Sequence, residues 1–154
     1  MVSSHISASG NVRGYSLSIS CKSSFNADKK SKQLTQSFEK RLGKAMEYEA
    51  GQIVARTEKG GGADGPLAEY APSTLKQKLE QLGPRGAIVN LTKTGNMLLG
   101  MQSDVEENST GLLGRIFFLP SEQQKARWNI ALRPNFFQLS KEQLATIVRR
   151  LRGQ

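Results

Sequence analysis

Apolar and polar residues alternate at period two near the N-terminus of this chain. In residues 15–21, YSLSISC, serines separate the apolar side chains. Successive side chains of a β-strand point to opposite faces, so this alternation predicts a strand with one buried face. Residues 1–11, which precede it, are rich in Ser and Gly and predict a flexible N-terminal tail.

The spacing of apolar residues changes to three and four between positions 32 and 57, which is typical of an amphipathic helix. The residues that recur at these steps are Leu34, Phe38, Leu42, Ala45, Met46, Glu49, Ile53 and Val54. Most of the polar face comes from Lys40, Arg41, Lys44, Glu47 and Glu49. Gly43 and Gly51 each weaken a helix by about 1 kcal/mol relative to Ala. We therefore expect them where the helix packs closely against a sheet or a neighbouring subunit.

A glycine-rich stretch, residues 58–70, follows this helix and predicts a flexible loop. A phosphate-binding P-loop would follow a strand and end in Gly-Lys-Ser/Thr before a helix. This run follows a helix and ends in Pro66, which argues against phosphate binding.

The middle of the chain carries short elements. Residues 72–82 predict a helix with Ser73 as N-cap, and Gly83 ends it. The apolar positions of this helix, which fall on one face, are Leu75, Leu79 and Leu82. Residues 87–91 predict a short strand or an extended segment. Thr94 is placed to cap a brief helix that runs through Met97 and Leu98 to Met101.

A hairpin is predicted next, because residues 103–107 and 112–119 flank the turn sequence NSTG. The second arm is the more apolar and is expected to be the more buried. Alternation in residues 128–132, WNIAL, predicts a further strand after a polar linker.

The chain closes with a capping box, in which Ser140 and Gln143 open a helix that runs to about Arg152. Its inner face consists of Leu144, Ile147, Val148 and Leu151. Arg149, Arg150 and Arg152 lie in the last turn, where cations complement the helix dipole. Contact with DNA or with an acidic partner is the second interpretation of these arginines.

Taken together, the elements predict an α+β fold in which a small, mostly antiparallel sheet packs against the long helix and the C-terminal helix, with extended loops. A length of 154 residues suits one domain, which we assign to residues 12–154.

The formal net charge is +9 and the isoelectric point is about 9.9. Such a balance favours a polyanionic partner, either nucleic acid or the acidic face of a protein, although a solvated basic surface has the same composition. Cys21 is the one cysteine, so no intramolecular disulfide can form and a reducing compartment is suitable. The sequence shows neither an apolar run that would span a bilayer nor a signal peptide, so we expect a cytoplasmic protein without a membrane partner.

The sequence contains no arrangement of side chains that is typical of a catalytic site. His5 lies on the predicted tail and is a poor general base, and adjacent Glu106 and Glu107 point to opposite faces of a strand. A metal site built on His and Cys is excluded by one residue of each type. We therefore expect a protein that is not an enzyme and carries no cofactor or metal.

Residues 71–78, 91–98 and 133–142 form three segments, in this order, that resemble segments of the virion morphogenesis and head–tail joining proteins of long-tailed bacteriophages. Residues 71–78, APSTLKQK, resemble their P-L-S-x-x-T-x-x-x-K segment, and residues 91–98, LTKTGNML, are similar to their L-x-x-T-G-x-L turn. Residues 133–142, RPNFFQLSKE, resemble their R-x-F-F-G-L-S-x-E segment before a last helix. Gln138 replaces the usual Gly, and Met97 replaces Leu. The residues that carry the resemblance are Pro72, Ser73, Thr74, Lys78, Leu91, Thr94, Gly95, Met97, Arg133, Phe136, Phe137, Leu139 and Ser140.

The resemblance covers roughly residues 30–152 and implies a structural virion protein without catalytic residues. It implies a subunit of a homo-oligomeric neck ring, with sixfold symmetry, of the connector, tail-completion or tail-terminator type. The ring would join the capsid connector to the tail tube, contact neighbouring connector and tail-terminator proteins, and let DNA pass through its lumen. Assembly would take place in the cytoplasm of the host bacterium. The alternative function is a small basic module that binds nucleic acid.

Overall fold

The computed structural model describes residues 7–13, 16–22, 29–91, 96–108 and 111–153. One antiparallel sheet has the strand order β1-β2-β6-β5. Its strands are β1 (Ser7–Arg13), β2 (Ser16–Lys22), β5 (Met101–Asn108) and β6 (Gly111–Phe118). The predicted N-terminal strand and the predicted hairpin are therefore confirmed, and β5 and β1 form the two edges of the sheet.

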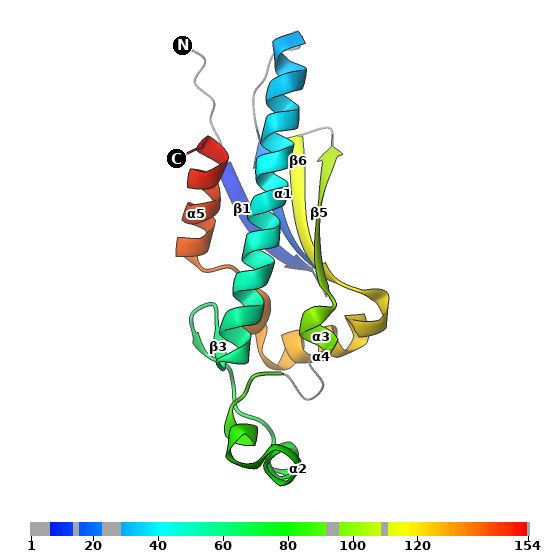
Figure 1. Ribbon diagram of the computed structural model, residues 1–154, viewed down its shortest axis with the longest axis vertical. Helices are drawn as coiled ribbons and strands as arrows, with labels where there is room; N and C mark the ends of the chain where they lie inside the picture. Colours follow the sequence, from blue (N-terminus) through cyan, green and yellow to red (C-terminus); the bar gives the residue numbers. More distant parts are fainter. Residues whose placement is uncertain (1–6, 14–15, 23–28, 92–95, 109–110, 154) are drawn as a thin grey trace.

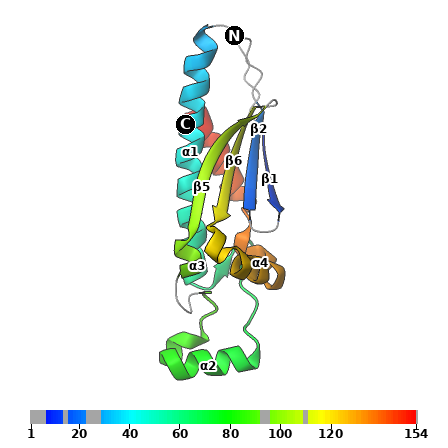
Figure 2. The same ribbon diagram turned by 90° about the vertical axis from the view of Figure 1, so that its right-hand side faces the viewer.

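Two helices cover the same face of the sheet (Figures 1 and 2). The long helix α1 (Lys29–Glu58) contacts β5 and β6, and α5 (Lys141–Arg152) contacts α1 and β1. The chain is thus an α+β domain with one helix layer on one sheet, as the sequence predicts. No described helix packs on the other face of the sheet, opposite α1 (Figure 2).

The core lies between these two layers. Leu17 of β2 is opposite Ile116 of β6, and both are buried together with the inward side chains of α1 and α5. These inward side chains are Phe38, Leu42, Ala45, Met46, Ile53, Ile147 and Leu151. The β6 residues alternate between buried and half-buried, as expected for a strand with one covered face. Each large apolar side chain that is fully buried contributes roughly 1.5–3 kcal/mol.

Three phenylalanines extend the core below the sheet. The ring of Phe118, at the end of β6, lies 5.0 Å from that of Phe137 and 6.1 Å from that of Phe136, centre to centre. Both partners belong to the single-turn helix η3 (Pro134–Phe137), which precedes α5. The tilted rings anchor the segment between α4 and α5 to the sheet.

The capping box of α5 is present and does more than start the helix. Ser140 accepts a hydrogen bond from the amide of Gln143, and Gln143 accepts one from the amide of Ser140. The side chain of Gln143 also accepts a hydrogen bond from Arg56 at 2.6 Å and donates one to Glu49 at 2.8 Å. The cap residue therefore also ties α5 to α1.

The remaining elements gather at the end of the molecule near the C-terminus of α1 (Figure 1). They are β3 (Gly61–Gly62), β4 (Gly65–Pro66), α2 (Pro72–Leu82), η1 (Gly83–Ala87), α3 (Asn96–Leu99), η2 (Pro120–Glu122) and α4 (Gln123–Leu132). Helix α2 and η1 stand apart from the body, at the far end in both views.

The predicted strand over residues 128–132 is wrong. These residues form the second half of α4, which leaves Trp128 and Leu132 exposed. Helix α4 buries only Ala126, so the positions of its apolar residues are not constrained to a helical period. An alternation over five residues is therefore too short to distinguish a strand from such a helix.

Two segments expected to be flexible have regular structure. Residues 7–11 of the expected tail belong to β1, whose seven residues all pair with β2. Strand pairing uses backbone groups, which Ser and Gly supply as well as other residues. The glycine loop within residues 58–70 contains the β3–β4 hairpin, which docks on Asn135. A Cβ at Gly62 would lie 2.5 Å from the Asn135 side chain, so glycine permits this approach.

Smaller expectations also change. Helix α2 begins at Pro72 after Ala71, and no side chain caps it, so Ser73 is not the N-cap. Pro72 occupies the first helical position, where a residue without an N–H leaves one fewer unpaired donor at the helix start. Residues 88–91 are irregular and form no strand. Glu49, assigned to the polar face of α1, is 1% exposed because Gln143 and α5 cover it.

Candidate assembly surface

The most unusual feature of the molecule is the arm that carries α2 and η1, residues 67–91. Both ends of the arm meet at Tyr70. The amide of Leu91 donates a hydrogen bond to the Tyr70 hydroxyl at 2.9 Å, which closes the arm across 21 residues of chain. Leu91 has a positive φ of 55°, a conformation that is uncommon outside glycine.

Lys78 of α2 anchors the arm from within. This side chain is 2% exposed, and its ammonium donates to the Tyr70 hydroxyl and to the Asn90 side chain, both at 3.0 Å. It also lies 4.4 Å from the centre of the Tyr70 ring. A buried ammonium is very costly without such partners, so Lys78 and Tyr70 depend on each other.

Arg133 attaches the arm to the body. This residue follows α4 and is 5% exposed, and its guanidinium donates to the carbonyls of Ala68 at 2.7 Å and Glu69 at 3.0 Å. The guanidinium carbon lies 4.9 Å from the centre of the Tyr70 ring. Tyr70 is thus contacted by Lys78, Leu91 and Arg133, one residue from each of the three segments that carry the phage resemblance.

Gly86 allows the arm to fold back on itself. A Cβ at this position would lie 2.3 Å from the carbonyl oxygen of Lys78, closer than real Cβ atoms come to another atom. The backbone of η1 therefore rests directly on the backbone of α2.

The outer surface of the arm is apolar. Leu79, Leu82 and Ile88 are each at least 40% exposed. Helix α2 thus buries a lysine and exposes two leucines, the reverse of the usual distribution. Exposed apolar side chains of this kind make the arm a candidate surface for contact with another molecule.

A second apolar surface lies at the same end of the body, on α3 and α4 (Figure 1). Leu99 is 80% exposed, Trp128 is 75% exposed and Leu132 is 61% exposed. Large aromatic side chains of this kind are common at the centres of protein interfaces. The arm and the α3–α4 end together form the candidate assembly surface.

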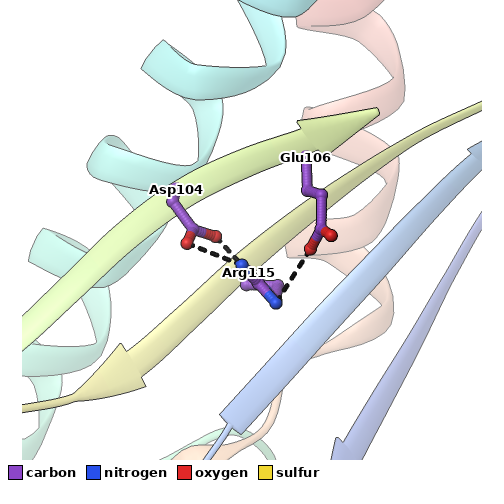
Figure 3. A network of polar contacts seen from close by, with 3 residues as sticks. All are labelled: Asp104, Glu106 and Arg115. Carbon is purple, nitrogen blue, oxygen red and sulfur yellow. Dashed lines mark hydrogen bonds and ion pairs between the residues drawn. The ribbon is translucent and has the colours of Figure 1, made fainter. Parts of the chain in front are cut away.

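The uncovered face of the sheet is polar at its β5 edge (Figure 3). Arg115 of β6 donates two hydrogen bonds to the carboxylate of Asp104, both at 2.9 Å, and forms an ion pair with Glu106 at 2.9 Å. The Asp104 hydrogen bond raises the pKa of Arg115. All three side chains are more than a third exposed, so the network organises this surface but stabilises it little.

Helix α5, which carries three arginines in its last turn, lies on the opposite side of α1 from β5 (Figure 1). Arg149, Arg150 and Arg152 are exposed, in the last turn as predicted. The Arg150 guanidinium stacks on Tyr48 of α1, with 3.7 Å between its carbon and the ring centre. Arg149 donates to the Thr146 hydroxyl.

The other residues of the phage-like segments divide into three groups. Phe136, Phe137 and Met97 are core residues, and Leu139 packs against the core. Pro72 and Ser140 begin helices, and Ser73 and Thr74 are exposed in the first turn of α2. Thr94 and Gly95 lie outside the described residues.

Several important residues are not apparent from the sequence. Tyr70 precedes a helix-starting proline and belongs to no periodic pattern, and Asn90 lies in an irregular segment. Trp128 falls in the five residues whose alternation predicts a strand. An exposed tryptophan cannot be recognised without knowing what covers its neighbours.

The described residues do not include three or more His, Cys, Asp or Glu side chains grouped to hold a metal ion. Within the same residues, no helix has the length and apolar character needed to cross a membrane. Comparisons of this chain with protein-family models, with curated proteins and with solved structures find no match.

Proposed function

We propose that this protein is a structural virion subunit that forms a homo-oligomeric ring in the neck of a long-tailed bacteriophage. The ring would join the capsid connector to the tail tube. The subunit acts through its surfaces and carries out no reaction.

The observation that carries this proposal is the meeting of three distant segments at Tyr70. Lys78, Leu91 and Arg133 come from the three stretches that resemble head–tail joining proteins, and each contacts the same aromatic side chain. The resemblance therefore falls on residues that hold one structural device, the arm. This agreement between sequence and geometry supports an architectural role for the segments.

The two apolar surfaces support the same proposal. The arm exposes Leu79 and Leu82, and the α3–α4 end exposes Leu99, Trp128 and Leu132. A ring subunit needs two different faces that fit each other, because a heterologous contact closes into a ring when the rotation is right. It also needs faces for the rings above and below it.

Cryo-electron microscopy of intact particles from the source virus tests the proposal. We expect a ring of this chain at the head–tail junction, with the arm against a neighbouring subunit or ring. Absence of the chain from complete particles would overturn the proposal.

A genetic experiment tests the surface itself. Trp128→Ala should reduce the yield of particles with attached tails, because it removes an exposed apolar side chain without disturbing the core. Lys40→Ala, which changes an exposed residue of α1, is the matched control and should leave the yield unchanged. Equal yields of tailed particles from both variants would contradict a role for the α3–α4 end.

The alternative is a basic module that binds nucleic acid, favoured by the net charge of +9 and the exposed arginines of α5. It predicts that the isolated chain binds duplex DNA with an affinity that falls steeply between 50 and 200 mM salt, roughly 10³-fold or more for six phosphate contacts. Fluorescence anisotropy distinguishes the two functions, since a ring subunit should bind DNA weakly as a monomer.

A further inference from the structure

The helix layer is incomplete at one edge of the sheet. Helix α5 flanks α1 on the β1 side, whereas an open groove of about 620 Å³ runs between α1 and β5 on the other side. Its walls include Gly43, Glu47 and Gly51 of α1, and Leu98, Met101 and Asp104 from α3 and the β5 strand.

The α1 wall of the groove has room for close contact. Gly43, Glu47 and Gly51 recur at four-residue steps and so share one face of the helix. A Cβ at Gly51 would meet no atom within 4 Å, and one at Gly43 would meet only Val105, at 3.8 Å. Close packing within the chain therefore does not explain why a glycine stands at position 51 of the helix. The other explanation expected from the sequence is close packing against a neighbouring subunit.

The groove is acidic. Glu47 lines it, and no lysine or arginine does so among the described residues. Asp104 borders the groove, but its carboxylate lies on the other face of the sheet. Glu47 is exposed and has no ion-pair partner in the described part of the chain, whereas Asp104 is already bound to Arg115. Glu107, also exposed and without such a partner, lies three residues further along β5.

Helix α5 carries the complementary pattern on its outer face. Lys141, Ala145, Arg149 and Arg152 are all exposed and recur at steps of four, four and three residues. This stripe is basic and contains one small residue. Because α5 lies at the β1 side and the groove lies at the β5 side, one copy presents both halves of a contact on opposite edges.

We propose that the groove between α1 and β5 receives the basic outer face of α5 from a second copy of this chain. Glu47 and Glu107 would face Arg149 and Arg152 of the second copy, and Gly51 would let the two helices approach closely. The contact is heterologous, so repetition leads from copy to copy and closes into a ring when the rotation between neighbours is right. This inference rests on the proposed ring function and names the surface that builds the ring.

Charge reversal in the full-length chain tests the contact by analytical ultracentrifugation at 50 mM salt. Glu47→Lys should raise the dissociation constant about tenfold, and so should the pair Arg149→Glu and Arg152→Glu, because each places like charges together. Combining the three substitutions should restore association. Asp64→Lys and Lys59→Glu, at exposed positions in the β3–β4 hairpin and in the turn before it, are matched controls outside the groove, α5 and the arm, and should change nothing.

Cross-linking tests the geometry independently. Two chains are mixed, one with Ser103→Cys in the groove and one with Ala145→Cys on α5, each in a Cys21→Ser background and with tags of different length. We expect the mixed disulfide-linked product to form in preference to both homodimers. Lys59→Cys replaces Ala145→Cys in the control mixture and should give little mixed product.

The outcomes separate the two proposals. A wild-type chain that remains monomeric and is absent from the neck of the particle overturns both the ring and the interface. A wild-type chain that associates, but is unaffected by charge reversal and gives no preferred mixed product, overturns the interface and leaves the ring standing. Circular dichroism of each variant distinguishes lost association from lost folding.

Discussion

The ammonium of Lys78 lies 3.0 Å from the hydroxyl of Tyr70 and 4.4 Å from the centre of its ring. The tyrosine thus contacts the lysine through both its polar and its aromatic parts. Since Lys78 is on α2 and Tyr70 is at the base of the arm, this pair ties the helix that exposes Leu79 and Leu82 to the base of the arm.

Removing the Tyr70 hydroxyl should loosen the arm. Tyr70→Phe leaves the ring in place but removes an acceptor from both Lys78 and the amide of Leu91. We expect a loss of about 1–3 kcal/mol in the free energy of unfolding, because buried donors lose a partner. Urea denaturation measures this loss. Tyr48→Phe, at an exposed tyrosine of α1, is the control and should change stability by less than about 0.5 kcal/mol. Equal effects of the two variants would contradict the anchoring role of Tyr70.

Two glycines should respond to alanine in opposite ways. Gly86→Ala places a Cβ 2.3 Å from a backbone oxygen of α2 and should destabilise the protein by roughly 1–3 kcal/mol. Gly51→Ala places a Cβ in open space within α1 and should stabilise the isolated chain by about 1 kcal/mol.

Thermal unfolding of the purified monomer compares both glycine variants with the wild type. A stable Gly86→Ala variant would show that η1 does not rest on α2 as described. For Gly51→Ala, the same variant should weaken self-association, because its Cβ occupies the proposed contact.

Glu49 should make stability depend on pH. Burial raises the pKa of Glu49 above its ordinary value of 4.5, although hydrogen bonding to Gln143 and the nearby arginines oppose the rise. At pH values between 4.5 and the higher folded-state pKa, Glu49 therefore keeps its proton in the folded state and has lost it in the unfolded state. The contribution of Glu49 to stability is full below pH 4.5 and is lost as pH rises through the higher folded-state pKa.

Glu49→Gln removes this titration while keeping an acceptor for Gln143. Urea denaturation from pH 4 to pH 8 measures the difference in unfolding free energy between the variant and the wild type. This difference should shift in favour of the variant as pH rises from 4.5 through the folded-state pKa of Glu49, and should then stay constant. Glu39→Gln, at an exposed position on the same helix, should track the wild type throughout. A pH-independent difference for Glu49→Gln would refute the shift.

The ion-pair network on the open face of the sheet should matter little for stability. Arg115→Gln removes its contacts with Asp104 and Glu106, yet the side chains involved are more than a third exposed. We expect a loss below about 1 kcal/mol that becomes smaller at high salt, because solvent and ions screen exposed charges. Guanidinium denaturation would itself screen the charges, so urea with and without 0.5 M NaCl is the suitable measurement. A larger loss that does not respond to salt would contradict this view.

Local patterns determined much of the fold. Apolar spacing alone identifies α1, whose stripe is long enough to exclude other periods, and the NSTG turn identifies the β5–β6 hairpin. Ser140 and Gln143 identify the start of α5, because a capping box is complete within four residues. Each of these signals depends on residues that are close together in the chain, so a short stretch of sequence is enough to identify the element.

Tertiary structure decided what lies far apart in the chain. Whether WNIAL forms a strand or a helix depends on which of its side chains other elements cover. Helix α4 buries so little of its surface that its apolar residues show no helical periodicity. The burial of Lys78 depends on Tyr70 and Asn90, and the attachment of the arm depends on Arg133, 65 residues from Ala68. Likewise Gln143 meets Glu49 across 94 residues. A buried charge is tolerated only where distant groups converge on it, and no local pattern specifies that convergence.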